Sequence, residues 1–375
     1  MFFKKVKHLV FTGLTILVCA CSNENQIKEE RELARSPINL LKTKFYNLDG
    51  RTLKIAFIGG SITEGAGCSS FDKSYTSLFV DLVKKEFGLE NAEQLNFGIG
   101  ASTSTFGLAR LNTVIASKPD LVVVEFAVND FGIENDSTVL YNHENILKRL
   151  FDEGIPTISL NLNALNGDTE SDNIMKVGYH QQHICVREQT GEGEFNDDVH
   201  PNDSGHQKIA DGLIIGLKKA LNSSSPINYQ FPKPITTYHQ HHTVWLPNQK
   251  FKSWKLEDNP IGGQSLFSNS PFDTLVFHTN ASKIGLAFRR YTLEEHIQNS
   301  KLEVYFNSEL IKVYSKSNTE GFMFVRSDVY KENLDETKSN ELKLIFSPLD
   351  STKDVKHDIL GVLLSGDQVN ASLIN

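Results

Sequence analysis

The chain has 375 residues, of which 39% are hydrophobic and 22% are charged, and its formal net charge at pH 7 is −8. This length and apolar content predict a folded protein of two domains and exclude a wholly disordered chain. The acidic balance, without a long basic run, argues against nucleic acid and anionic lipid headgroups as partners.

The first twenty residues are typical of an export signal. Three lysines precede an apolar run from Leu9 to Val18, and small residues and cysteines follow it. A basic head, a short apolar stretch and a small-residue cleavage site indicate a secretory signal, because the run is too short for a permanent transmembrane helix. The segment from Val18 to Cys21 also resembles a bacterial lipobox, which implies removal of residues 1–20 and lipidation of Cys21. An ordinary signal peptide with incidental cysteines is the alternative.

This interpretation predicts an exported bacterial lipoprotein, anchored in the cell envelope on the periplasmic side or at the cell surface. Removal of residues 1–20 takes three lysines and no acidic residue, so the net charge becomes −11. Residues 21–49 are expected to be a tether and lead-in, since the polar composition up to about residue 35 cannot build a core. The lipid anchor would be the sole membrane contact.

Two further cysteines, Cys68 and Cys185, remain in the predicted mature chain. An exported compartment would preserve a disulfide between them. Spacing along the chain does not show whether their Cα atoms come close enough for one. We expect two separate buried thiols, with the disulfide as the alternative.

From residue 50 to 222, short apolar runs alternate with helical patterns in which apolar residues recur three and four positions apart. Strands that alternate with helices predict a parallel sheet wrapped by helices, because parallel neighbours need crossover connections. The expected strands are residues 53–58, 94–97, 121–126 and 157–162, with a weaker one at 183–186. The expected helices are residues 75–87, 105–115, 139–151 and about 205–221.

After a serine- and proline-containing linker at 223–240, the apolar pattern changes to alternation with a period of two residues. Short runs rich in Val, Ile, Phe and Tyr are separated by Asn, Ser, Asp and Gly, which predicts strands without intervening helices. Residues 241–375 are therefore expected to form a jelly-roll-like β-sandwich. The expected strands are 243–246, 274–278, 283–288, 302–306, 309–314, 322–325, 341–346 and 359–364.

Four segments of the α/β part carry the groups that a serine acyl-transfer site needs. Ser61 follows the first strand, a loop of small residues spans 96–104, Asn129 follows the 121–126 strand, and residues 197–203 precede the last helix. Ligands of open α/β sheets gather at the carboxyl ends of the strands, so these segments are expected to converge. The Asn129 amide could donate to an oxyanion.

Asp197 lies three residues before His200, a spacing that lets one turn bring the carboxylate onto the imidazole. The carboxylate would fix the tautomer of the ring, so that its other nitrogen could take the proton of Ser61. Asp198 is the wrong neighbour for this geometry.

Together, these segments resemble the four conserved blocks of the SGNH hydrolases, also called GDSL esterases. The residues that carry the resemblance are Gly59-Gly-Ser-Ile-Thr63, the loop from Asn96 to Gly100, Val128-Asn129-Asp130 and Asp197-x-x-His200-Pro-Asn. The resemblance covers roughly residues 50–221. It implies a flavodoxin-like three-layer α/β/α domain that hydrolyses esters through an acyl-enzyme, with Ser61 as nucleophile, His200 as base and Asp197 as its orienting carboxylate.

The resemblance also implies an oxyanion hole made by the backbone N–H of Ser61, a backbone N–H of the second block and the side chain of Asn129. Alignment on Asn96 puts Ala101 at the usual glycine position and Gly100 just before it, so both residues stay candidates for the second donor. A backbone donor tolerates alanine.

Several other residues have less definite roles. Gly60 stands where the family name has an aspartate. Glu125 interrupts an apolar strand and needs a partner or a rim position, because an unpaired buried carboxylate is costly. Asp130 could order the loop that carries Asn129, or serve as a plain cap or surface residue. His206 is expected on the surface of the last helix.

No cofactor or metal is expected. His239, His241 and His242 have no carboxylate or cysteine near them at ligand spacing, so they are interpreted as one face of the linker.

The predicted protein is a serine esterase that removes small acyl groups, above all O-acetyl, from carbohydrate or polysaccharide. The substrate follows mainly from the resemblance, because an envelope location and an appended sandwich are typical of glycan-acting esterases. Two alternatives stay open: an O-acetyltransferase on envelope glycan that uses the same triad, and a non-catalytic glycan-binding lipoprotein. The oligomeric state is not predicted.

Overall fold

A computed structural model describes most of the chain from residue 36 onward. The described residues are 36–48, 50–224, 232–236, 239, 241–245, 253–258, 264–270, 272–290, 300–314, 324–348 and 357–374. The predicted signal at 1–20, the lipidation site Cys21 and the tether up to residue 35 lie outside them. None of the described helices combines the length and the apolar content that a membrane crossing requires.

The first domain is built on a five-stranded parallel sheet with the strand order β2-β1-β3-β4-β5. The strands are β1 (Leu53–Gly59), β2 (Ala92–Gly98), β3 (Leu121–Glu125), β4 (Thr157–Asn161) and β5 (Ile184–Arg187). This is the flavodoxin-like order of doubly wound sheets, so the predicted fold class is confirmed. Gly59 pairs with both Gly98 and Glu125, which brings the carboxyl ends of the three strands to one level.

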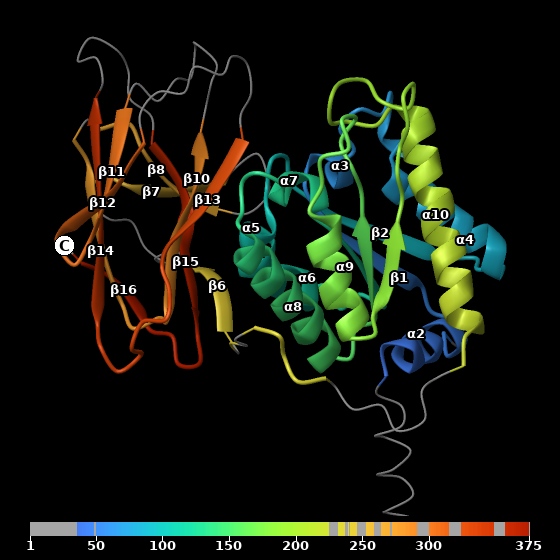
Figure 1. The fold of residues 1–375 in the computed structure, drawn as a ribbon. Helices are drawn as coiled ribbons and strands as arrows, with labels where there is room; N and C mark the ends of the chain where they lie inside the picture. The colour runs from blue at the N-terminus through green and yellow to red at the C-terminus, as the bar shows by residue number, and fades with distance from the viewer. Residues whose placement is uncertain are drawn as a thin grey trace, which may run out of the picture.

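Helices cover both faces of this sheet (Figure 1). One face carries α2 (Pro37–Tyr46), α4 (Tyr75–Phe87) and α10 (Asp203–Asn222). The other face, toward the second domain, carries α5 (Ser104–Ala109), α6 (Leu111–Ala116), α8 (Asp136–Asp152) and α9 (Ser171–His180). Strand β1 contributes to the apolar core on both faces of the sheet. Phe57 packs in the core beneath α2, α4 and α10, and Ile58 packs in the core beneath α5, α6 and α8, because successive side chains of a strand point to opposite faces.

Several helices differ from the sequence prediction. The predicted helix at 105–115 is two helices that break at Arg110, whose guanidinium donates to the carbonyl oxygens of Phe97 (2.7 Å) and Gly59 (3.2 Å). Helix α2 lies in the predicted lead-in and buries Leu41 and Phe45, and it was not predicted. Helix α9 was not predicted either.

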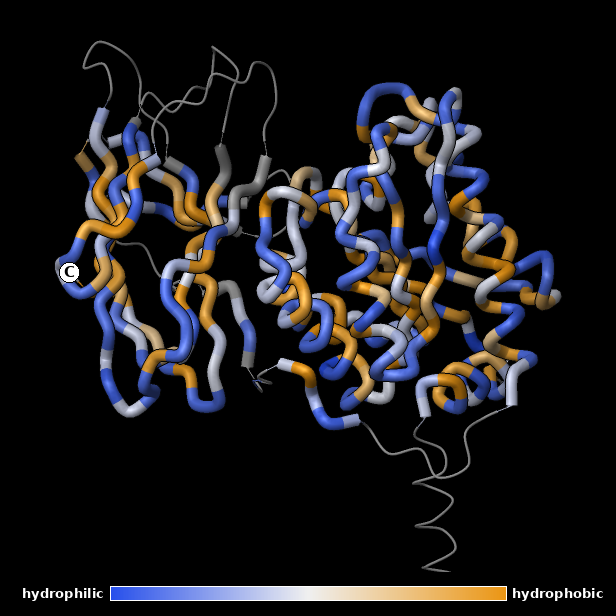
Figure 2. Tube along the Cα trace, in the orientation of Figure 1, coloured by the Kyte–Doolittle hydropathy of each residue, from blue (hydrophilic) through white to orange (hydrophobic). Residues whose placement is uncertain are grey.

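The second domain is a sandwich of two antiparallel sheets, as predicted (Figure 1). One sheet has the order β13-β10-β15-β8-β7, with β6 also paired to β15, and the other has the order β12-β11-β14-β9-β16. A single apolar cluster contains Leu286 of the first sheet and Phe277 of the second, so the sheets pack face to face. Apolar residues alternate with polar ones along many of the strands (Figure 2). The strands β7, β8 and β16 were not predicted.

The strands of the sandwich have these bounds: β6 (His241–Trp245), β7 (Lys255–Asp258), β8 (Gln264–Ser268), β9 (Thr274–Thr279), β10 (Lys283–Arg290), β11 (Ser300–Phe306), β12 (Glu309–Tyr314), β13 (Phe324–Lys331), β14 (Asn340–Pro348), β15 (His357–Gly366) and β16 (Ala371–Ile374).

The two domains share a small apolar core between α5 and the sheet that contains β10 and β15. Ile99 and Phe106 of the first domain belong to one buried cluster with Leu360 and Leu363 of the second. Next to it, the hydroxyl oxygens of Thr103 and Ser327 lie 3.3 Å apart. The second domain therefore packs directly on the loop at 99–103, which follows β2.

Cys68 and Cys185 are separate free thiols, each half-buried. This agrees with the expectation of two thiols and not with the alternative of a disulfide.

Candidate active site

Three side chains that are remote in sequence meet at the carboxyl end of the parallel sheet. Ser61 is the first residue of the short helix α3 (Ser61–Glu64), directly after β1, and Asp197 and His200 lie in the loop before α10. The Oγ atom of Ser61 lies 2.9 Å from Nε2 of His200, and Nδ1 of His200 lies 2.8 Å from Oδ2 of Asp197. The structure thus brings the predicted nucleophile, base and carboxylate into one hydrogen-bonded chain.

The turn that carries Asp197 also fixes its carboxylate. Oδ1 accepts the backbone N–H groups of Val199 (2.8 Å) and His200 (2.7 Å), which leaves Oδ2 for the imidazole. Partial burial raises the pKa of Asp197, but the hydrogen bonds from His200 and the two backbone N–H groups outweigh it, and the pKa is lowered overall. The ionised carboxylate holds the proton on Nδ1, so the lone pair of Nε2 faces the Ser61 hydroxyl.

Asn129 lies against the backbone just before the serine. It sits in the short helix α7 (Ala127–Asp130), and a Cβ atom added to Gly60 would lie only 2.0 Å from its Oδ1 and 2.7 Å from its Cγ. This contact explains why glycine stands at position 60, since any side chain there would collide with Asn129. The structure gives the Asn129 amide no hydrogen bond to another described residue, and the N–H of Ser61, as the first residue of α3, has no intrahelical acceptor.

The loop after β2 forms a tight turn beside these donors. The N–H of Ser102 donates to the carbonyl of Ile99 (3.2 Å), and the N–H of Ile99 donates to the carbonyl of Gly59 (3.1 Å). Ala101 occupies the third position of this turn with φ = 55°. That left-handed conformation favours glycine, which accounts for the glycine that the SGNH pattern has at this position.

The same turn separates the two candidates for the second backbone donor. The N–H of Gly100 faces the carboxylate of Glu64, and a Cβ atom at Gly100 would lie 3.0 Å from Oε2 of that residue. The N–H of Ala101 makes no hydrogen bond within the described part of the chain. Of the two, Ala101 is therefore the residue whose N–H is available to a ligand.

Comparison with known proteins agrees with this geometry. The sequence of residues 57–208, which contains all four segments, matches the GDSL-like Lipase/Acylhydrolase family. Residues 57–208 therefore form a GDSL-like hydrolase domain. The protein is accordingly a carboxylic ester hydrolase of the SGNH type, as predicted. A search of curated protein sequences finds no match to this chain.

Solved structures resemble the chain over both domains. It is similar to a two-domain esterase (CEX) active on acetylated mannans, with a TM-score of 0.72 and 18% identity over 88% of this chain and 96% of that one. The structure of such an esterase co-crystallised with mannopentaose gives a TM-score of 0.71 and 18% identity over 92% and 94% of the two chains. At this identity, the likeness concerns the fold.

His206 of the GDSL-like domain is buried and bonds to the segment that follows the nucleophile, so its predicted surface position was wrong. The side chain is fully buried; Nδ1 accepts the N–H of Tyr75 (3.1 Å), so Nε2 carries the proton and donates to the carbonyl of Ala66 (3.1 Å). The apolar residues Ile209 and Leu213, three and seven positions later, share its helix face. That periodicity could have revealed the burial from sequence.

The segment that follows α3 packs closely on the same loop. Gly67 has φ = 94°, and a Cβ atom there would lie 2.1 Å from the carbonyl oxygen of Pro201. Its own carbonyl accepts a hydrogen bond from the side chain of Asn196, and Asp203 accepts the N–H of Ser69 (2.7 Å). These contacts connect the segment that follows Ser61 to the loop that carries His200.

The left-handed backbone at Ala101 leads to a stability prediction. We expect Ala101→Gly to raise the free energy of unfolding by about 1 kcal/mol, because the Cβ atom of a left-handed residue crowds the neighbouring carbonyl. Urea denaturation measures the change. Lys118→Gly is a matched control, since Lys118 is exposed with φ = 54° and should show a similar gain. A gain at Lys118 with none at Ala101 would contradict the strained turn.

Glu125 lies beneath the nucleophile turn. Its side chain is fully buried at the end of β3, and Oε2 lies 3.4 Å from the hydroxyl of Thr63. The N–H groups of Gly60 and Val128 face the carboxylate, but within the described part of the chain Oε1 makes no close hydrogen bond. Burial, with a smaller contribution from the charge of Asp130, raises the pKa of Glu125 to about 7. The sequence left two possibilities for Glu125, a buried position with hydrogen-bond partners or a position at the rim. The structure shows the buried position.

This raised pKa predicts how stability depends on pH. In the unfolded chain Glu125 loses its proton near its ordinary value of 4.5, but in the fold it keeps the proton to about pH 7. The contribution of Glu125 to the free energy of unfolding is therefore fully present below about pH 4.5 and is lost as pH rises through 7. Between pH 5 and 8 this free energy should fall by about 2–3 kcal/mol. Urea denaturation at both pH values should show that Glu125→Gln lacks this decline. If the free energy of unfolding fell equally in the variant and the wild type between pH 5 and 8, the raised pKa of Glu125 would be contradicted.

Asp130 orders the loop that carries Asn129 and also caps a helix, so of the roles left open by the sequence only the surface one is wrong. The buried carboxylate accepts the N–H of Ser104 at the start of α5 (2.7 Å), and its second oxygen lies 3.3 Å from Nε2 of His143. It therefore caps α5 and connects the segment that carries Asn129 to the helix that follows the loop at 96–104.

Proposed function

We propose that the chain is a serine esterase that removes small acyl groups, above all O-acetyl, from carbohydrate or polysaccharide. The observation that carries the serine mechanism is the chain of contacts from Ser61 to His200 (2.9 Å) and on to Asp197 (2.8 Å).

In the proposed mechanism, Oγ of Ser61 attacks the ester carbonyl carbon while its proton passes to Nε2 of His200. The backbone N–H groups of Ser61 and Ala101 and the amide of Asn129 hold the oxyanion of the tetrahedral intermediate. The intermediate collapses, the alcohol leaves with the proton from His200, and an acyl-enzyme remains. Water then repeats the sequence, which releases the acid and restores the serine.

Two observations support a carbohydrate ester as the substrate. The side chains of His200 and Asp197 are 29% and 57% exposed, so the triad lies at an open surface that a bulky polymer could reach. The likeness to an esterase active on acetylated mannans extends over both domains, including the sandwich.

The acyl group and the alcohol can be tested together. Hydrolysis of p-nitrophenyl esters from acetate to octanoate should show kcat/KM falling by about tenfold or more along the series, since longer acyl chains would meet a site made for a small one. Acetate should be released from acetylated mannan or xylan oligosaccharides, with Ser61→Ala as the inactive control. A preference for octanoate, or intact acetyl groups on every glycan tested, would contradict the proposal. Acetyl transfer to an added acceptor glycan would instead identify a transferase.

We propose further that the mature protein begins at a lipidated Cys21. The basic and apolar residues at 4–18 and the Val18-to-Cys21 segment support this. Cys21→Ala should move the protein out of the membrane fraction of its host, and mass spectrometry of the wild-type N-terminus should find the lipid. An unmodified N-terminus at another residue would contradict the anchor.

A further inference from the structure

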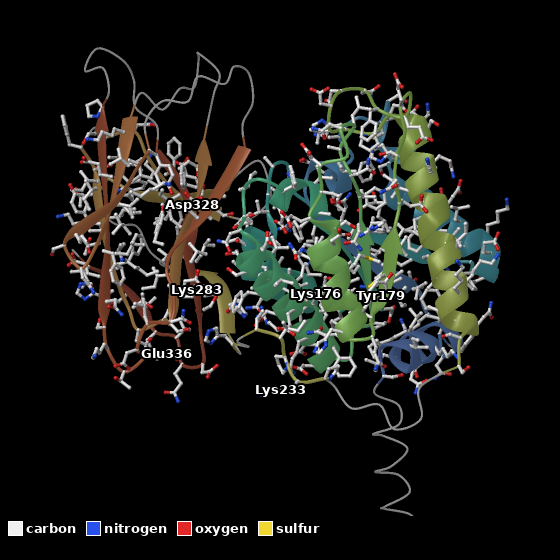
Figure 3. All side chains as sticks on the ribbon, in the orientation of Figure 1. Lys176, Tyr179, Lys233, Lys283, Asp328 and Glu336 are labelled. Atoms are coloured by element: carbon white, nitrogen blue, oxygen red, sulfur yellow. The ribbon has the colours of Figure 1, made fainter. Side chains whose placement is uncertain are left out.

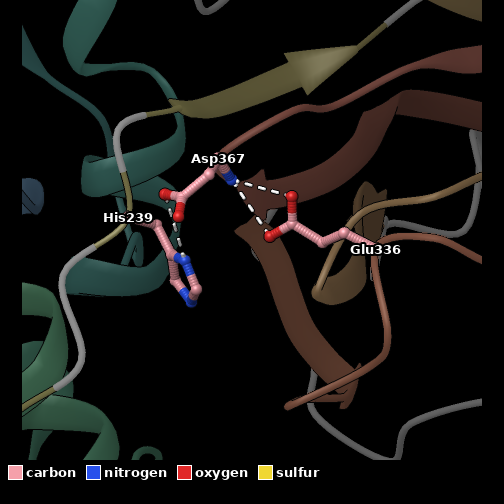
Figure 4. Close-up of side chains that lie close together, drawn as sticks. All are labelled: His239, Glu336 and Asp367. Atoms are coloured by element: carbon pink, nitrogen blue, oxygen red, sulfur yellow. Dashed lines mark hydrogen bonds and ion pairs between the residues drawn. The ribbon is translucent and has the colours of Figure 1, made fainter.

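Three potential metal ligands meet where the linker reaches the second domain. His239 lies just before β6, Glu336 in the turn between β13 and β14, and Asp367 directly after β15. One ligand atom from each residue lies within 4.8 Å of the others (Figure 4). Because the carboxylates are far from His239 along the chain, spacing analysis could not detect the cluster.

The hydrogen bonds of Ser282 fix the tautomer of His239. The Ser282 hydroxyl donates its single hydrogen to the carbonyl of Ser365 (3.0 Å), and its Oγ lies 3.3 Å from Nε2 of His239. Since that hydrogen is in use, Oγ accepts from the imidazole. Nε2 therefore carries a proton and is engaged with Ser282, and Nδ1 is the ring nitrogen that remains for a ligand.

Nδ1 of His239 faces a carboxylate. Nδ1 is buried and has no hydrogen-bond partner among the described residues, while Oδ1 of Asp367 lies 3.8 Å away and points toward it (Figure 4). A cation between these two atoms would be bound by both, because an imidazole nitrogen and a carboxylate oxygen are both common metal ligands.

The remaining ligand is already oriented. The Glu336 carboxylate accepts the backbone N–H groups of Asp367 (3.0 Å) and Gln368 (2.9 Å), and each of its oxygens keeps a further lone pair. Lys283 of the same domain, labelled with Glu336 in Figure 3, is engaged elsewhere: it pairs with Glu332 (3.1 Å) and lies over the Tyr141 ring. The cluster thus offers carboxylate oxygens from two residues and one imidazole nitrogen.

We propose that His239, Glu336 and Asp367 bind a divalent transition-metal ion, with Zn²⁺ as the best match. One imidazole nitrogen, two carboxylate oxygens and a water would complete a tetrahedral shell. Zn–ligand distances of about 2.0–2.2 Å place ligand atoms about 3.3 Å apart in such a shell, so a small side-chain rotation closes the 3.8 Å separation. The bond from Ser282 to Nε2 is the kind of outer contact that orients a metal-binding histidine.

The ion would fasten the linker to two turns of the sandwich. The N–H of His239 also donates to the Asn145 side chain on α8 (3.2 Å), so this point of the linker touches both domains. All three ligands belong to the linker and the second domain, and the site is independent of the proposed esterase mechanism. It departs from the sequence expectation that no metal is bound.

Isothermal titration calorimetry of the metal-stripped full chain with ZnCl₂ and MnCl₂ tests the site. The wild type should bind one Zn²⁺ ion more tightly than Mn²⁺, and its melting temperature should rise with added Zn²⁺. His239→Ala and Asp367→Asn should each weaken Zn²⁺ binding by about tenfold or more and remove the rise in melting temperature.

Variants of the carboxylates and of a distant histidine distinguish this site from zinc binding by histidines alone. Glu336→Gln and Asp367→Asn keep every histidine of the 239–242 segment, so unchanged Zn²⁺ affinity in both would mean that the histidines alone bind the ion, and the proposal would fail. His278→Ala removes a half-exposed histidine 3.5 Å from Glu341 and should leave the affinity unchanged. Esterase activity of each variant reports correct folding. Absence of saturable binding to the wild type would also overturn the site.

Discussion

Ser61→Ala should lower kcat for p-nitrophenyl acetate by about 10⁴-fold or more. Without the hydroxyl, the lone pair of His200 Nε2 has no proton to accept from a nucleophile, and no acyl-enzyme can form. The substitution removes one atom from a half-buried position and leaves the contacts of Asn129 with Gly60 in place. KM and thermal stability should therefore change little, and steady-state kinetics with circular dichroism checks all three quantities.

A double variant sharpens this expectation. Because Ser61 and His200 act through one shared proton, Ser61→Ala/His200→Ala should be no slower than either single variant. Ser117→Ala is a matched control, since its hydroxyl only donates to the carbonyl of Val114 at the end of α6. It should keep the wild-type rate. If Ser61→Ala retained more than about 1% of that rate, the serine mechanism would be wrong.

Local sequence patterns predicted those features that depend on local chemistry. The apolar spacing at 75–87 matches α4 residue for residue, because Ser74 caps its start and Gly88 ends it in a left-handed conformation. The positions of Ser61 and Asn129 could be predicted as well. Each follows a buried strand, and the parallel order of the sheet brings the carboxyl ends of β1 and β3 side by side.

Features that depend on contacts between distant segments could not be predicted in this way. The break at Arg110 arises because its guanidinium binds carbonyl oxygens at the ends of β1 and β2. No pattern within 105–115 encodes those acceptors. The left-handed turn at Ala101 likewise depends on Ile99 binding the carbonyl of Gly59, so sequence alone left Gly100 and Ala101 as equal candidates.

The structure also shows why the second domain matters to the oxyanion side of the site. Ile99 and Thr103 flank the turn at Ala101, and both are buried at the domain junction. Ile99 packs in the shared apolar cluster, and the hydroxyl of Thr103 meets that of Ser327. The backbone that would present the Ala101 N–H is thus held from one side by the parallel sheet and from the other by the sandwich.

Asn129→Ala should lower kcat by about 10²- to 10³-fold while KM changes little, because the amide would donate to negative charge that develops only in the transition state. The Ser61–His200 contact does not involve Asn129, so the nucleophile should remain intact and the residual rate should keep its dependence on Ser61. Steady-state kinetics with p-nitrophenyl acetate gives both constants.

A second asparagine separates this catalytic effect from a loss of stability. Asn135 caps α8 by accepting the N–H of Thr138 (3.0 Å), so Asn135→Ala should lower the free energy of unfolding by about 1 kcal/mol without changing kcat. Asn129→Ala should show the reverse pattern, because the structure gives its amide no hydrogen bond to another described residue. A kcat within about fivefold of wild type for Asn129→Ala would remove the amide from the oxyanion hole. The N–H groups of Ser61 and Ala101 would then be the donors that remain.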